Sequence, residues 1–98
     1  MNVEIENLIK VLNEGLNKYL KKNDYSVDKS FFDQLEKKLN HELSHPFNEQ
    51  FFTPTQLLND YIQKNLNSTL RLTSSDLGEE FRMALLKWGV AKAKFFDE

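Results

Sequence analysis

Apolar residues in the first half of this 98-residue chain recur with the period of an α-helix. Between residues 5 and 20 they follow the i, i+3, i+4, i+7 spacing, which places them on one stripe of a helix. A second stripe runs from residue 27 to residue 43, and Pro46 prevents that helix from continuing much further. Residues 1–45 are therefore expected to form a helical hairpin. Gly15 inside the first stripe costs about 1 kcal/mol relative to alanine, which indicates either close packing or a soft point.

Helix-capping sequences divide the second half of the chain. Thr53 and Gln56 have the spacing of a capping box around Pro54, and they predict a helix that ends near Leu66. Residues 73–76 repeat this capping pattern, and the helix that they open is expected to end at Gly89. Short alternations of apolar and polar residues at 69–72 and at 91–96 each predict a small strand.

These elements predict a mainly α fold in a single domain that spans residues 1–98. The helical hairpin would be followed, in residues 50–98, by a half with the element order of a winged-helix or helix-turn-helix unit, including a short two-stranded β element. The apolar stripes of the first two helices exceed what a hairpin can bury by itself. They must therefore pack on the C-terminal half or on another chain.

Composition excludes several classes of protein. The chain has no cysteine, which excludes disulfides, thiolate catalysis and zinc sites built on sulfur. Its formal net charge is -2, so binding to nucleic acid would depend on a local basic patch. The first residues are acidic where a secretory signal would be basic, and no apolar run reaches the length of a membrane span. We expect a cytoplasmic protein with no cofactor, no small-molecule substrate and no membrane partner.

One short motif matches the metal-binding helix of zinc peptidases. His41, Glu42 and His45 have the H-E-x-x-H spacing in which two histidines hold zinc and the glutamate activates water. On a helix, however, both histidines point away from the apolar stripe and toward solvent. Pro46 follows the second histidine directly, and no clear third ligand follows apart from Glu49. We interpret the motif as a coincidence on the surface, and we predict neither a metal site nor an enzyme.

The expected winged-helix half carries candidate contacts to nucleic acid. Hydroxyl and N–H groups at a helix start can bind phosphate, arginine can reach a base edge, and lysines can form a basic rim. The residues assigned to these roles are Arg71, Ser74, Ser75, Arg82, Lys87, Lys92 and Lys94. Asp76, Glu79 and Glu80 count against the assignment, because they place negative charge where phosphates would approach. The alternative is that the same elements only close a small core.

Residues 51–61 and 77–92 contain a threonine-capped helix and then a leucine-glycine helix, which ends in an aromatic-glycine-aliphatic turn and a basic tail. This order resembles the C-terminal winged-helix segments of phage and mobile-element primase–helicases. With its added hairpin, the chain also resembles the small polymerase-partner proteins of staphylococcal cassette chromosome replication operons. The resemblance implies that the chain has no catalytic residue, that it contacts DNA and that it docks on a polymerase.

Two functions are therefore predicted. The first is a non-catalytic accessory role in mobile-element DNA replication. The C-terminal half would bind DNA, with single strands favoured, and the hairpin would dock a polymerase, primase or helicase subunit. The second is a helical protein-binding module, such as an immunity or inhibitor protein, which uses its acidic first half to bind a basic partner and makes no contact with nucleic acid. Salt-sensitive retention on heparin or DNA would separate the two.

Overall fold

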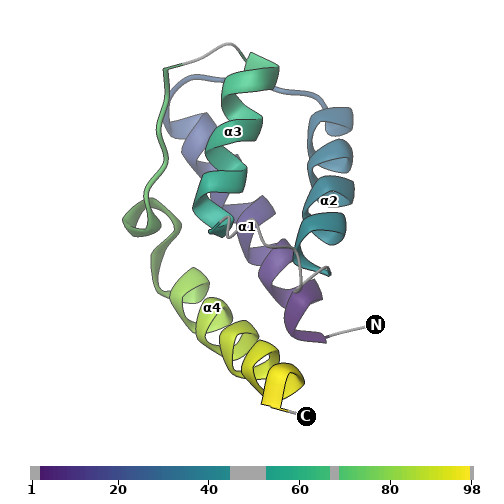
Figure 1. Cartoon of the computed structure of the whole chain (residues 1–98). Helices are drawn as coiled ribbons and strands as arrows, with labels where there is room; N and C mark the ends of the chain where they lie inside the picture. The colour runs from purple at the N-terminus through teal and green to yellow at the C-terminus, as the bar shows by residue number, and fades with distance from the viewer. Residues whose placement is uncertain (1–2, 45–52, 67–68, 98) are drawn as a thin grey trace.

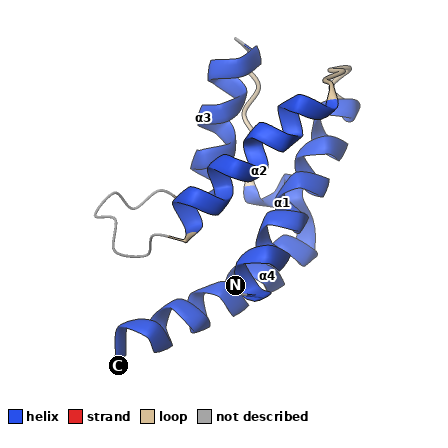
Figure 2. Cartoon of the chain, turned by 90° about the vertical axis from the view of Figure 1, so that its right-hand side faces the viewer, coloured by secondary structure: helices blue, strands red, loops and turns tan. Residues whose placement is uncertain are grey.

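The computed structural model describes residues 3–44, 53–66 and 69–97, and these residues form a bundle of four helices (Figure 1). The helices are α1 (Val3–Lys22), α2 (Lys29–Leu43), α3 (Pro54–Leu66) and α4 (Ser74–Asp97). The central helix is α1, which contacts the other three and packs most extensively against α4. The C-terminal turns of α4 extend away from α2 and α3 (Figures 1 and 2).

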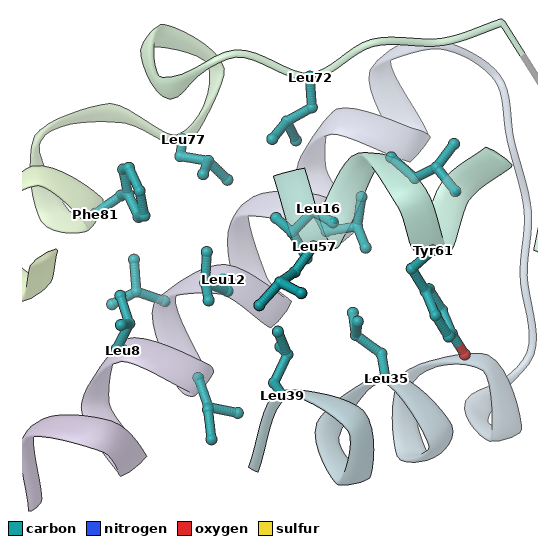
Figure 3. Packing of buried hydrophobic residues seen from close by; sticks show 14 of the residues in the cluster. Leu8, Leu12, Leu16, Leu35, Leu39, Leu57, Tyr61, Leu72, Leu77 and Phe81 are labelled. Atoms are coloured by element: carbon teal, nitrogen blue, oxygen red, sulfur yellow. The ribbon is translucent and has the colours of Figure 1, made fainter. Parts of the chain in front are cut away.

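One buried apolar cluster joins all four helices. The predicted stripe of α1 forms its centre, and Leu8, Leu12 and Leu16 have no exposed surface. The leucines of α2 approach one side of α1, while Leu77 and Phe81 of α4 approach another (Figure 3). The stripes of the predicted hairpin are thus covered by the C-terminal half of the same chain.

The turn between α1 and α2 is set by backbone hydrogen bonds and one capping side chain. Asp24 adopts a left-handed conformation with a φ of 63°. The N–H of Tyr25 donates to the carbonyl of Leu20 over 2.8 Å, and the N–H of Asp24 donates to that of Lys21 over 3.1 Å. This pair of bonds is a Schellman motif, which ends a helix by satisfying its last carbonyls. Asp28 then caps α2, because its carboxylate accepts the N–H of Phe31 over 3.2 Å.

A buried tyrosine ties α3 to the start of α2. The hydroxyl of Tyr61 donates to the carbonyl of Phe31 over 2.6 Å, and the centres of the two rings are 4.9 Å apart. Burial raises the pKa of Tyr61 above its ordinary value, because the charged phenolate would lose its hydration. The tyrosine therefore joins the helices in its neutral, hydrogen-bonding form.

Both predicted strands are wrong, and so is the winged-helix-like half that they would have completed, since the described residues contain no strand. In the first predicted strand, the N–H of Leu72 donates to the side-chain oxygen of Asn59 over 2.8 Å. The side-chain nitrogen of Asn59 donates in turn to the carbonyl of Leu72 over 2.9 Å. A single amide side chain on α3 thus takes the place of a neighbouring strand.

The second predicted strand, residues 91–96, belongs to α4, and the expected helix end at Gly89 is also wrong. Alanine and lysine alternate in this segment, but both are among the strongest helix formers and neither favours a strand. A single glycine costs a helix about 1 kcal/mol, which is too little to end it when the flanking residues favour helix.

The real interruption of α4 lies eleven residues earlier, at Gly78. Thr73 begins the helix, and Asp76 accepts both the N–H of Thr73 over 2.7 Å and its hydroxyl over 3.0 Å, as the capping pattern predicted. Gly78 then has a φ of 82° and a ψ of -168°, which no helical residue adopts. The kink presses Leu77 against α1, where a methyl group on Gly15 would overlap the Leu77 side chain. Of the two interpretations of Gly15, close packing is therefore the correct one.

Candidate functional site

Among the side chains that the structure describes, the predicted nucleic-acid contacts lie in two separate stretches of the chain. Arg71 is exposed in the segment before α4, and Ser74 and Ser75 are exposed at the start of that helix. These three lie close together only because they are near neighbours in the chain. Arg82 and Lys87 are exposed further along α4. Lys92 and Lys94 occupy its last turns, where the structure describes the backbone but not these side chains.

Helix geometry and nearby acids weaken this set further. At about 100° per residue, Arg82 and Lys87 lie roughly 140° apart around the axis of α4, so they face different sides of it. The guanidinium of Arg82 lies 4.0 Å from the carboxylate of Glu79, with both side chains largely exposed. Acids at the restart of a helix are explained by the helix dipole, which favours negative charge there. Arg82 and Lys87, which the winged-helix prediction had grouped, thus lie on different sides of α4.

The H-E-x-x-H motif lies at the end of α2. His41 is exposed, Glu42 is half-buried, and the helix ends at Leu43 with Ser44 as its C-cap. His45 lies outside the described residues. Within the described part of the chain, no group of three histidine, aspartate or glutamate side chains is arranged to hold a metal ion.

A groove lined by charged residues runs between α1 and α2. It consists of two hollows of about 470 and 370 Å³, which share Asn13, Glu14 and Glu36 and so form one continuous feature. The ionisable residues of the groove are five acids and two lysines, namely Glu6, Glu14, Asp28, Asp33 and Glu36 against Lys10 and Lys29. The groove is therefore markedly more acidic than the chain as a whole.

Hydrogen bonds favour the charged form of Asp28, at the end of the groove where α2 begins. The hydroxyl of Ser30 donates to the carboxylate of Asp28 over 2.7 Å, and the N–H of Phe31 donates to the same carboxylate. These hydrogen bonds, that of Ser30 first, lower the pKa of Asp28 below its ordinary value, because they stabilise the charged form. Asp28 is consequently ionised throughout the neutral range.

The floor of the groove holds an unsatisfied hydrogen-bond acceptor. The side-chain oxygen of Asn13 is buried and has no hydrogen-bond partner within the described structure. A buried carbonyl oxygen without a donor costs about 1–3 kcal/mol in lost hydration. Asn13 lines both hollows, so the residue that carries this buried oxygen belongs to the groove.

The sequence did not reveal this groove. The polar residues of the first predicted helix and the acidity of the first half of the chain are visible in the sequence. Whether those of α1 and those of α2 would face each other depends on how the two helices rotate about their axes. That rotation is fixed by the leucines beneath the groove, and no short motif records it.

A second surface feature is the outer face of α4. Phe81 and Ala84 are buried against α1 with 2% of their surface exposed, yet Met83 and Leu86 on the same helix are 49% and 60% exposed. A hollow of about 290 Å³ lies beside them, between α4 and residues Asn7 and Val11 of α1. Between Phe81 and Leu86, α4 therefore presents apolar side chains on two faces.

No family model matches the chain, and no curated protein or solved structure is similar to it at a significant level. The resemblance to primase–helicase segments thus stays a prediction. Among the described helices, none is both long enough and apolar enough to cross a membrane.

Proposed function

We propose that this chain is a non-catalytic helical module, located in the cytoplasm, that binds another protein by receiving a basic segment in the groove between α1 and α2. The observation that carries the proposal is the groove itself, where carboxylates outnumber lysines five to two around a buried acceptor that has no partner. An arginine or lysine side chain of a partner supplies positive charge that offsets the excess of carboxylates, and N–H donors that suit those carboxylates.

The length of the groove favours a peptide segment as its occupant. On α1 the groove runs from Glu6 to Asn17, and at 1.5 Å per residue this corresponds to roughly 16 Å, or about three helical turns. A helix of the partner with one basic face would place cations along this length at intervals of three or four residues. The proposal keeps the second function predicted from the sequence and assigns its acidic interaction face to named residues.

Isothermal titration calorimetry with two designed peptides tests this function. The probe is an amphipathic helix of lysine, arginine and leucine, and its counterpart has glutamate in place of the cations. We expect only the cationic peptide to bind, with an affinity that falls as salt is added. The double variant Glu14→Gln, Glu36→Gln should bind about tenfold more weakly, since each removed charge pair is worth up to about 1 kcal/mol.

A matched control uses the same change of charge outside the groove. Glu42→Gln with Glu79→Gln removes two carboxylates from other surfaces, and we expect this variant to bind the cationic peptide as the unmodified chain does. Equal loss in both double variants would show that binding follows net charge and not the groove. That result would overturn the proposed function.

Asn13 provides a test that separates binding from stability. Asn13→Leu removes the unsatisfied acceptor from the groove floor, so the free energy of unfolding should rise by about 1 kcal/mol. The same change should lower the affinity for the cationic peptide. A variant that is more stable and binds equally well would exclude Asn13 from the site.

The replication-accessory function is the competing proposal. Its strongest support is the exposed group of Arg71, Ser74 and Ser75 at a helix start, where hydroxyl and N–H groups suit a phosphate. Fluorescence anisotropy with single- and double-stranded oligonucleotides at low and high salt tests it. Salt-sensitive binding that weakens in the double variant Lys92→Gln, Lys94→Gln would favour this function over the groove proposal.

A further inference from the structure

The outer face of α4 has a pattern that fits a second copy of the same helix. From Glu79 onward the helix is regular. Met83 and Leu86 are three residues apart, which is the spacing of the two apolar seam positions in a pair of packed helices. Glu80 lies one turn before Met83, and Lys87 lies one turn after it, on the same exposed side of α4. One face thus has an acid at its start, two apolar residues in the middle and a base at its end.

This face is complementary in charge to itself when two copies lie antiparallel. An antiparallel arrangement that opposes Met83 of one chain to Leu86 of the other also brings Glu80 of each chain near Lys87 of its partner. The two-fold symmetry repeats this ion pair, so one helix face supplies both halves of each contact. We infer that two copies of this chain associate through the outer faces of their α4 helices, packed antiparallel.

The parallel alternative is disfavoured by the same charges. In a parallel pair, Arg82 of one helix would flank Lys87 of the other, and two cations would meet on each side of the seam. In the antiparallel pair, each Lys87 meets a carboxylate instead. Opposite charges attract and like charges repel by similar amounts at exposed positions, so the antiparallel orientation is selected.

The hollow between α4 and α1 gives the association a place to pack. Its lining includes Met83, Lys87 and Glu80 at the rim, with the buried residues Ala84 and Val11 beneath them. Apolar side chains of a second copy can enter this hollow, where they are no longer exposed to water. This surface shares no residue with the groove between α1 and α2, so the two proposals fail or succeed separately.

Sedimentation velocity of the full chain over a concentration series is the experiment. The unmodified chain should pass from monomer to dimer as concentration rises. Lys87→Glu should raise the dissociation constant of the dimer by about tenfold, since two attractive pairs become repulsive. Glu80→Lys should do the same, and the double reversal Glu80→Lys, Lys87→Glu should restore the original dissociation constant to within about twofold.

Two further variants distinguish association through this face of α4 from non-specific hydrophobic association. Leu86→Ser should leave the chain monomeric at every concentration, whereas Val3→Ser, which changes an exposed apolar residue outside this face, should leave the dimer unchanged. Circular dichroism confirms that each variant is folded, as expected for exposed positions. A monomer for the unmodified chain, or a double reversal that does not restore the dimer, would overturn the inference.

Discussion

Helix α4 contains two glycines, and the chain uses them in opposite ways. At Gly78 the backbone leaves the helical conformation, with a φ of 82°, whereas at Gly89 the helix runs on to Asp97. In both places a side-chain atom would meet open space, so crowding does not explain the difference. What differs is the tertiary contact of the preceding residue. Leu77 before Gly78 packs against Gly15 of α1, whereas helix α4 continues through Gly89. A glycine permits a break, and the neighbouring contacts decide whether it happens.

The largest expected change in stability comes from removing the contact of Leu77 with α1, which accompanies the kink at Gly78. Leu77→Ala leaves a cavity against α1 and should lower the free energy of unfolding by about 2–5 kcal/mol, as is usual for a buried leucine. Leu86→Ala is the matched control on the same helix, because that side chain is 60% exposed in a single copy. At protein concentrations low enough to keep the chain monomeric, its loss should change the free energy of unfolding by less than about 0.5 kcal/mol. Urea denaturation followed by circular dichroism measures both. Similar losses in the two variants would contradict the assignment of an inner and an outer face.

The next effect concerns the backbone conformation itself. Gly78→Ala places a side chain where φ is positive and ψ is near 180°, a region that only glycine adopts readily. We expect a loss of about 1–3 kcal/mol in the free energy of unfolding. Because nothing lies within 4 Å of the added carbon atom, any loss reports conformation and not steric overlap. An unchanged or increased stability would mean that the helix is continuous at residue 78.

A smaller loss of stability is expected when the hydrogen bonds between Asn59 and Leu72, in the segment before α4, are removed. Asn59→Ala removes both hydrogen bonds to the backbone of Leu72 and should cost about 1–2 kcal/mol. Asn65→Ala is its control, since Asn65 bonds only to the carbonyl of Tyr61 in its own helix, over 2.9 Å. We expect this control to cost at most a few tenths of a kcal/mol. Equal costs would show that Asn59 does not anchor this segment.

Whether the sequence predicted a feature depends on how far apart in the chain the interacting residues lie. Local signals were reliable where the interacting residues are close in sequence. The stripe of α1 is buried as predicted, and the capping box of Thr53 and Gln56 forms, with bonds of 3.0 and 3.2 Å. The strand prediction at Leu72 failed because its partner is a side chain thirteen residues away. The alternation there is real, but a side-chain amide satisfies the backbone that a strand would have paired.

The same reasoning explains why the candidate site was missed while its charge was noticed. Acids on α1 and α2 were visible in the sequence, but the groove requires Glu14 and Glu36 to face each other across two helices. The kink at Gly78 was equally hidden. A leucine-glycine pair and a tryptophan-glycine pair look alike in the sequence, and only the packing of Leu77 against Gly15 distinguishes them.

Gly89→Ala should give the smallest change in the free energy of unfolding, and this change should be an increase. Here glycine sits within a continuous helix in open space, so alanine reduces the conformational freedom of the unfolded chain without strain in the folded one. The free energy of unfolding should therefore rise by about 0.5–1 kcal/mol, and helical circular dichroism should not fall. If instead this variant loses stability as Gly78→Ala is expected to, residue 89 also needs a conformation that only glycine adopts. That outcome would contradict a helix that continues from Gly89 to Asp97.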